Sequence, residues 1–256
     1  MKLSIITINR NNAEGIERTI LSVIDQKFTN YEYIIIDGDS TDDSVEIIKK
    51  HSEHISFWVS EPDSGIYNAM NKAIKVATGE YLIFMNSGDC FISSDTLTNV
   101  FTENPMEDLL VGNTIMNWKR RKERRSIASK ITFYNILSHR CIPHQATFTK
   151  RYLFDEIGFY EEEFKICADR NFFFLALFKF NKSFKRLNED IALMDTTGVS
   201  SIESNFSLIK EEEDKIFQKY FPYFYADYKE LYRIKRFTFK RLKRHIKWRL
   251  RKFIRG

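Results

Sequence analysis

Polar residues able to bind a cation or a phosphate group follow the apolar segments in the first ninety residues. An aspartate ends or closely follows three of these segments, and the first segment ends in a threonine and an asparagine. The residues are Thr7, Asn9, Asp37, Asp39, Asp63 and Asp89. If the segments are neighbouring strands, these side chains converge on one edge of a sheet.

Carboxylates gathered at one place repel one another, and their burial costs free energy unless a cation or hydrogen-bond donors compensate. Mg²⁺ or Mn²⁺ typically takes one or two protein carboxylates and completes its ligands from phosphates and water. The pattern therefore indicates a metal that bridges a nucleoside diphosphate and stabilises its charge as it leaves. Asp37, in the turn "DGDST", is placed to bind a base or a ribose. A single strand-end aspartate is more often a cap or turn residue, so the hypothesis depends on the whole set.

The elements that must position these residues alternate between strands and helices. Continuous apolar segments at 3–8, 31–37, 55–60 and 81–85 predict strands, separated by helical patterns at 13–26, 40–51 and 66–79. Ser40 is predicted to cap the second helix with Asp43 in a capping box, and Gly79 to end the third in a left-handed conformation. Continuous apolar strands separated by helices predict a parallel sheet covered on both faces, which binds ligands beyond the carboxyl ends of its strands.

The second hundred residues have a less regular pattern. Strands are predicted at 108–118, 124–133 and 185–195, with a solvated charged hairpin at 119–125 and an apolar helix that starts near Asp169. After residue 204 the pattern is helical. We therefore expect an α/β catalytic domain at 1–204, whose first half is residues 1–100 and second half residues 101–204, and a helical basic extension at 205–256.

The extension differs in charge from the rest of the chain, and the whole chain has a net charge of +5. Residues 228–256 hold thirteen Lys or Arg and one acid. A helix there would carry an apolar stripe opposite a basic face, which is typical of helices on anionic lipid. The stripe consists of Phe239, Leu242, Ile246, Leu250 and Phe253. A helix packed on the catalytic domain or in a homodimer is the alternative, and nucleic acid is not expected because no nucleic-acid module accompanies the tail.

Cysteine usage and hydropathy indicate a cytoplasmic protein, peripheral at the inner membrane face if the tail binds lipid. The three cysteines, Cys90, Cys141 and Cys167, have neither disulfide nor metal-ligand spacing. No apolar segment reaches spanning length, and no signal-peptide pattern follows the first residues.

Four segments in series resemble the family 2 glycosyltransferases, which are nucleotide-sugar-dependent enzymes with the GT-A fold, a Rossmann-like mixed sheet flanked by helices. They are "LSIITINRN", "TILSVIDQKFTNYEYIIIDGDSTDDS", "SEPDSGIYNAMNKAIKVATGEYLIFMNSGD" and "PHQATFTKRYLFDEIGFYEEEFKICADRNFFFLAL". The resemblance covers about residues 2–180, and it implies a nucleotide-sugar-binding half at 1–100 and an acceptor-binding half at 101–204. It implies transfer of a sugar from a nucleotide donor, with UDP-sugars favoured, to a saccharide or lipid-linked acceptor, with inversion by a single displacement.

The resemblance also implies roles for individual residues. Asp169 falls where family members carry the general base, and Asp89 at the last aspartate of their Mn²⁺- or Mg²⁺-binding motif. His144 and Gln145 match a pair on the acceptor or diphosphate side. The residues expected at the donor nucleotide are Thr7, Asn9, Asp37, Asp39, Asp63, Gly65 and Asn86.

The sequence departs from the family at three of these places. Gly88 stands where many members carry another acid, and Ala168 precedes the base where many have a glutamate. Asp39 stands where many relatives have glycine, so it is either a nucleotide contact or a turn residue. Two other functions compete with transfer: a nucleotidyltransferase that makes nucleotide sugars, and a non-enzymatic scaffold or nucleic-acid binder that depends on the tail. A nucleotidyltransferase would be expected to carry a glycine-rich phosphate-binding segment after the first strand, and this sequence has none there.

Overall fold

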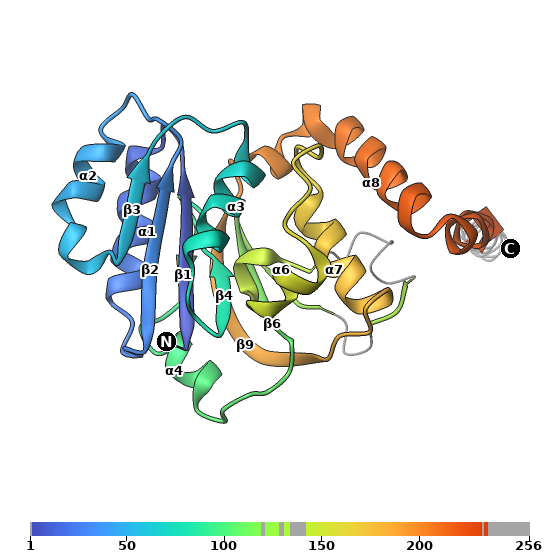
Figure 1. Ribbon diagram of the computed structural model, residues 1–256, viewed down its shortest axis with the longest axis horizontal. Helices are drawn as coiled ribbons and strands as arrows, with labels where there is room; N and C mark the ends of the chain where they lie inside the picture. The colour runs from blue at the N-terminus through green and yellow to red at the C-terminus, as the bar shows by residue number, and fades with distance from the viewer. Residues whose placement is uncertain (1, 119–120, 128–130, 134–141, 232, 235–256) are drawn as a thin grey trace, which may run out of the picture. The chain divides into compact units, whose positions relative to one another are not determined.

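The computed structural model of the chain describes residues 2–118, 121–127, 131–133, 142–231 and 233–234 (Figure 1). The chain divides into two compact units, residues 1–209 and 210–256. The apolar stripe predicted at 239–253 and Cys141 lie outside the described residues. Within the described ranges, no helix combines the length and the apolar character needed to span a bilayer.

A mixed sheet forms the centre of the first unit. Its nine strands, counted over the described residues, follow the order β3-β2-β1-β4-β8-β6-β9-β5, and β7 pairs with β6. Their bounds are β1 Leu3–Asn9, β2 Tyr31–Asp37, β3 Phe57–Ser60, β4 Tyr81–Phe84, β5 Cys90–Phe91, β6 Leu109–Trp118, β7 Arg121–Arg125, β8 Thr147–Lys150 and β9 Phe184–Asp195.

The parallel half of the sheet confirms the prediction from the continuous apolar segments. Strands β1, β2, β3 and β4 are parallel neighbours, and all side chains of β1 and β4 are buried. Such burial requires helices on both faces of the sheet. Strands β8 and β6 then continue the sheet in antiparallel pairing from β4, and β9 runs parallel to β6.

Helices cover both faces of this sheet (Figure 1). One face packs on α1, α2 and α4, where Ile16, Ile20 and Val23 of α1 meet odd-numbered residues of β1 and β2 in the main core. The other face lies under α3, α6 and α7. The bounds are α1 Ala13–Ile24, α2 Ser44–Lys50, α3 Ile66–Val76, α4 Thr96–Phe101, α6 Tyr152–Ile157 and α7 Ala168–Phe178, with 3₁₀ turns η1 Ser52–His54, η2 His144–Ala146, η3 Val199–Ser201 and η4 Glu203–Asn205.

The described residues of the second unit are helical except for Phe221. Helix α8 (Phe206–Tyr220) runs across the boundary between the units, and residues 222–231 form a further helix. This agrees with the helical pattern predicted after residue 204.

The predicted start of the second helix is wrong. The helix begins at Ser44, and Asp43 precedes it without a side-chain capping bond. Ser40 does not cap, because its hydroxyl oxygen accepts from the Asn11 N–H. Instead Asp42 Oδ1 accepts from the Ser44 backbone N–H at 3.1 Å.

The predicted conformation of Gly79 is also wrong. Gly79 is not among the residues with positive φ, and α3 ends three residues earlier. A Cβ at this position would lie 2.5 Å from the backbone nitrogen of Ser4. The glycine is therefore needed for close packing of the chain against β1, not for a left-handed turn.

The charged segment predicted as a hairpin contains a strand. Strand β7 pairs with β6 from Thr114↔Arg125 to Trp118↔Arg121, so it begins three residues before the strand predicted at 124–133 and shares only Arg124 and Arg125 with it; residues 126–127 and 131–133 are not in a strand. Lys and Arg are common on edge strands, where charge discourages pairing with another chain. The charge of this segment therefore marks an edge strand.

Candidate active site

The carboxyl ends of β1, β2 and β3 bring four polar side chains into contact. Asn9 and Asp37 are paired in the sheet register, and Ser60 is the partner of Asp37 on β3. The Asp37 carboxylate accepts hydrogen bonds from Asn9 Nδ2 at 2.7 Å, Ser40 Oγ at 2.6 Å and Ser60 Oγ at 2.6 Å. Neutral donors thus compensate this fully buried carboxylate.

Thr7 is buried beneath this edge of the sheet, whereas Asp39 is exposed on its surface. Thr7 is fully buried, and its hydroxyl donates to the Met85 carbonyl at 2.7 Å and lies 2.9 Å from the Tyr33 hydroxyl. It therefore forms part of the wall beneath the edge. Asp39 is exposed in a left-handed conformation with φ of 58°. Its carboxylate is available to solvent.

Asp63 folds the loop after β3 over the turn after β2. Asp63 Oδ1 accepts from the Gly65 backbone N–H at 2.9 Å, and Gly65 has φ of 135°. A Cβ on Gly38 would lie 2.3 Å from Asp63 Oδ2. Gly38 thus admits the Asp63 carboxylate, and the two loops form one surface.

Asp89 lies in the turn after β4 and is 6% exposed. Its Oδ1 accepts the Asp195 backbone N–H at 2.8 Å, and Gln145 supplies a side-chain hydrogen bond. Burial raises the pKa of the Asp89 carboxyl from 3.8 to about 7, although the charge of His144 and the Asp195 N–H act in the opposite direction. The donors around Asp89 therefore leave its charge undercompensated.

Asp195 is a site residue that the sequence reasoning missed. A Cβ on Gly88 would lie 2.8 Å from Asp195 Oδ2, so the glycine leaves room for this second carboxylate. Arg18 Nη2 lies 3.4 Å from the same oxygen. Asp195 ends β9 as Asp37 ends β2, and this shared strand-end position is the signal by which it could have been found.

Asp169 lies in the first turn of α7 and is held by two side chains from other elements. Tyr67 of α3 donates to Asp169 Oδ1 at 2.8 Å, and His144 Nδ1 lies 3.0 Å from Asp169 Oδ2. Burial alone would raise the pKa of the Asp169 carboxyl, but the hydrogen bond and charge of His144, with the Tyr67 hydroxyl, lower it. Asp169 is therefore ionised at neutral pH.

The His144–Gln145 pair connects the two carboxylates. His144 contacts Asp169, its Nε2 lies 3.4 Å from Asn86 Nδ2, and Gln145 hydrogen-bonds Asp89. The His144 and Asp169 side chains are 20% and 16% exposed, so solvent still reaches them. Burial lowers the pKa of the imidazole, but Asp169, and to a smaller extent Asp89, raise it overall.

The oxygen donors near Asp89 fit a hard divalent cation that is bound mainly through substrate. Within the described ranges, no three His, Cys, Asp or Glu side chains form a metal-binding group. A buried carboxylate whose pKa is raised by burial nevertheless gains from a cation, and Mg²⁺ or Mn²⁺ needs only one or two protein carboxylates beside phosphate and water. Asp89 is the residue that would hold it.

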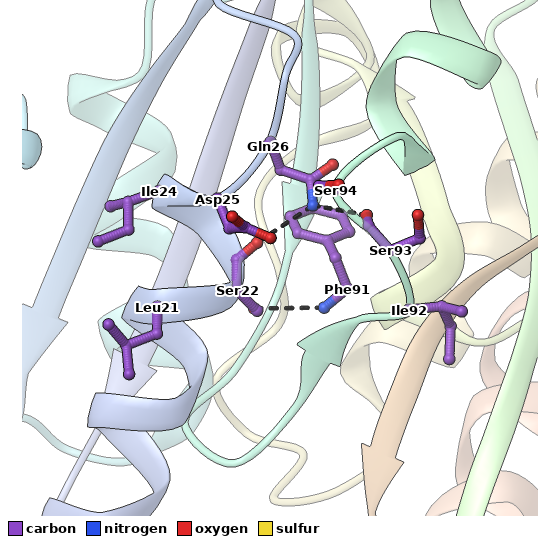
Figure 2. A pocket seen from close by; sticks show the side chains of 9 residues that line it. All are labelled: Leu21, Ser22, Ile24, Asp25, Gln26, Phe91, Ile92, Ser93 and Ser94. Atoms are coloured by element: carbon purple, nitrogen blue, oxygen red, sulfur yellow. Dashed lines mark hydrogen bonds between the residues drawn. The ribbon is translucent and has the colours of Figure 1, made fainter.

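A separate pocket lies at the far end of α1 from this edge. It is lined by Leu21, Ser22, Ile24, Asp25, Gln26, Phe91, Ile92, Ser93 and Ser94 (Figure 2). Two of its polar side chains are engaged in holding its walls: Ser22 Oγ accepts from the Phe91 N–H at 3.3 Å, and Gln26 Nε2 donates to the Ser93 carbonyl at 2.8 Å. None of the site residues described above lines this pocket.

Comparisons with known proteins identify a family and a fold for this chain. The chain is 32% identical over 212 residues to an uncharacterised glycosyltransferase of Mycobacterium tuberculosis, covering 78% of this chain and 77% of the relative. Two solved structures share the fold. Staphylococcus aureus TarS 1–349 in complex with UDP has a TM-score of 0.65 and 22% identity, over 76% of this chain and 60% of that one. Mannosyltransferase PcManGT from Pyrobaculum calidifontis, in complex with GDP-Man and Mn²⁺, has a TM-score of 0.57 and 18% identity, over 75% of this chain and 56% of that one.

The chain thus spans about three fifths of each solved structure, and the mixed sheet with its flanking helices is the GT-A fold expected from the sequence. The model of the family described as "Glycosyl transferase family 2" matches residues 4–174, which include every site residue predicted from the sequence. The chain therefore belongs to glycosyl transferase family 2.

Proposed function

We propose that this protein transfers a sugar from a nucleoside diphosphate donor to a hydroxyl group of a saccharide or lipid-linked acceptor, with inversion at the anomeric carbon. One observation carries the proposal. Asp89 and Asp169, which come from different parts of the chain, are connected through two adjacent residues, His144 and Gln145, at one edge of the sheet. One carboxylate carries an undercompensated charge and the other is ionised, which suits a cation site and a base.

The donor nucleotide is proposed to bind at the ends of β1, β2 and β3. Asp37 is held rigid by its three side-chain donors, and the loop of Asp63 and Gly65 lies over the adjacent turn. Such preorganised polar groups suit recognition of a ribose or a base. The remaining proposed donor contacts are Thr7, Asn9, Asp39 and Asn86. Among the possible nucleotides we favour UDP, since TarS shares the fold and has been solved with UDP.

Mn²⁺ or Mg²⁺ is proposed to bind the donor diphosphate at Asp89. When bound, the cation would supply charge stabilisation to the departing diphosphate. The structure of PcManGT, which holds GDP-Man together with Mn²⁺ in the same fold, supports this proposal. The Asp195 N–H and Gln145 would hold the Asp89 carboxylate in place for the cation.

Asp169 is proposed as the general base. It would accept the proton of the acceptor hydroxyl as that oxygen attacks C1 of the donor sugar and the bond from C1 to the diphosphate oxygen breaks. A positioned base contributes on the order of 10²–10⁴ in rate. The Tyr67 hydroxyl has two acceptors, Asp169 Oδ1 and the Ile166 carbonyl at 2.6 Å, and one hydrogen. It can therefore donate to the ionised carboxylate and turn to Ile166 once Asp169 is protonated.

The test is a panel of UDP-, GDP- and dTDP-sugars, with release of nucleoside diphosphate measured with and without Mn²⁺. We expect one nucleotide class to be turned over, and Asp169→Asn to lower turnover by at least about 100-fold while binding of the diphosphate is kept. Asp155→Asn is the matched control, because Asp155 is 65% exposed on α6. Near-normal turnover by Asp169→Asn would reject the base assignment. Turnover of a nucleoside triphosphate with a sugar phosphate would instead identify a nucleotidyltransferase.

Binding of residues 228–256 to an anionic membrane surface remains part of the proposal. Sedimentation with vesicles that contain an anionic lipid, compared for the full chain and a chain that ends at residue 227, tests it. Equal sedimentation of the two chains would reject a membrane role for the tail.

A further inference from the structure

His144 lies between two groups of the site that come from different elements. Its Nδ1 is 3.0 Å from Asp169 Oδ2 on α7, and its Nε2 is 3.4 Å from the amide of Asn86 in the turn after β4. The charged groups that face the imidazole are Asp169 and, further away, Asp89. Both are carboxylates, so the surroundings of the ring favour a positive charge.

The amide of Asn86 indicates how the ring is protonated. Asn86 Oδ1 is buried and has no hydrogen-bond partner among the described residues, while Asn86 Nδ2, a donor, faces His144 Nε2. A half-turn of the amide would bring Oδ1 to the ring, where it would accept from Nε2–H. The turn places Nδ2 where Oδ1 now lies, so it exchanges one unpaired amide atom for the other; the Asp169 and Asp89 carboxylates, which favour a charged ring, are what favour this arrangement. It requires both ring nitrogens to carry hydrogen, one for Asn86 and one for Asp169.

The same contacts fix the Asp169 carboxylate at both oxygens. Tyr67 donates to Oδ1 and His144 to Oδ2, and the two donors come from α3 and η2. A carboxylate held at both oxygens cannot rotate freely about its side-chain bond. Of the two donors only His144 can carry a charge, so it alone can favour the ionised form of Asp169 by Coulombic attraction as well.

We propose that His144 is a positioning residue that acts through Asp169: as an imidazolium bridging Asn86 and Asp169, it keeps the base ionised and in one orientation. This inference rests on the proposed function, in which Asp169 is the base. It assigns His144 to the proton-transfer side of the reaction and not to binding of the diphosphate.

Two substitutions separate the contact from the charge. In His144→Asn the amide nitrogen can take the place of Nδ1, so the hydrogen bond to Asp169 is kept without the charge. In His144→Gln the amide reaches the position of Nε2, so the contact with Asn86 is kept and the one with Asp169 is lost. We expect kcat to fall on the order of 10–100-fold in His144→Gln and less in His144→Asn, as for other residues that orient a reacting group. KM for the active nucleotide sugar should change less than twofold.

The pH profile tests the charge. Without the imidazolium the pKa of Asp169 is higher, so the acidic limb of kcat should move to higher pH in both variants. A structural role alone would lower kcat equally at every pH. In the Asp169→Asn background neither His144 substitution should lower turnover further, because residues that act as a unit are not additive. Unchanged pH limbs, an additive loss, or loss of thermal stabilisation by UDP would overturn the proposal.

A spectroscopic measurement decides the inference even if no sugar donor is turned over. The ring ¹⁵N shifts of the five histidines of the full chain can be recorded, with His144 assigned from the signal missing in His144→Asn. We expect both ring nitrogens of His144 to be protonated at pH 7 in the unsubstituted protein, and a shift toward neutral imidazole in Asp169→Asn. A neutral ring, or one unaffected by Asp169→Asn, would overturn the proposal, whereas failure of the sugar panel alone would overturn only the proposed function.

Discussion

Replacement of Asp89 by asparagine should stabilise the metal-free protein at alkaline pH and weaken metal-dependent donor binding. Burial raises the pKa of this carboxyl from 3.8 to about 7, so the folded protein holds a proton that the unfolded chain has already lost between these two values. Stability therefore falls as pH rises from about 4 to about 7, because the unfolded state binds fewer protons there. An asparagine has no such ionisation cost.

The size of the effect follows from the difference in pKa. A shift of about three units at about 1.36 kcal/mol per unit gives about 4 kcal/mol at pH 8 as the upper limit. The substitution keeps an oxygen for the Asp195 N–H but forces the Gln145 hydrogen bond to rearrange, at about 1 kcal/mol. We therefore expect a net gain of about 1–3 kcal/mol at pH 8, which shrinks toward pH 4. For a chain of this size each kcal/mol raises Tm by about 2–4 °C.

The assay is denaturant-induced unfolding in EDTA at several values between pH 4 and pH 8, on the full chain and the variant. Asp37→Asn is the matched control, since Asp37 is also a buried strand-end aspartate but accepts three side-chain hydrogen bonds. Its substitution should destabilise the fold at pH 8, opposite in sign to Asp89→Asn. If Asp89→Asn were destabilising at pH 8, or its effect independent of pH, the reasoning from burial would be refuted.

Three further results are expected. Tyr67→Phe removes one of the two donors to the proposed base and should lower turnover about 10-fold, with thermal stabilisation by UDP unchanged; equal loss of both would contradict a role in catalysis. Gly88 and Gly158 have similar positive φ, but a Cβ at Gly88 would lie 2.8 Å from Asp195 whereas a Cβ at Gly158 would meet open space. Gly88→Ala should therefore lower the unfolding free energy by about 1–3 kcal/mol more than Gly158→Ala. Equal losses in the two variants would show that Asp195 moves aside freely. Calorimetric Mn²⁺ binding in the presence of UDP should tighten from pH 6 to pH 8, since Asp89 must lose its proton; a pH-independent affinity would exclude Asp89 as the ligand.

The parallel half of the fold could be predicted because its signals are local. The apolar composition of β1, β4 and the last five residues of β2 predicts their burial, and strand ends locate Asp37 and Asp89 at one edge. The errors occurred where a distant residue competes with a local rule. Ser40 matches a cap, but its hydroxyl oxygen accepts from the Asn11 N–H, and Gly79 matches a helix end but packs on β1. These partners lie elsewhere in the chain, so spacing alone could not identify them.

Most residues of the site were identified before the structure, but the contacts between them were not. Asp169 and His144 were found only through resemblance, and nothing in their spacing indicates that they touch. Asp195 was missed because its partner, Gly88, was considered only as a position where many family members carry an acidic residue. The structure gives that glycine a physical reason, since the Asp195 carboxylate occupies the space that its side chain would fill.

The two carboxylates of the site differ in ionisation because their neighbours differ, and this difference orders the steps of the proposed reaction. Asp169 has a lowered pKa through His144 and Tyr67, so it is ionised before any substrate binds. Burial raises the pKa of Asp89 to about 7 in the absence of a cation, so this carboxyl keeps its proton to a higher pH than Asp169 does. Paired groups whose environments push their pKa values apart are typical of acid–base sites. A cation that arrives with the donor would displace the proton from Asp89, and the base would already be ionised when the acceptor arrives.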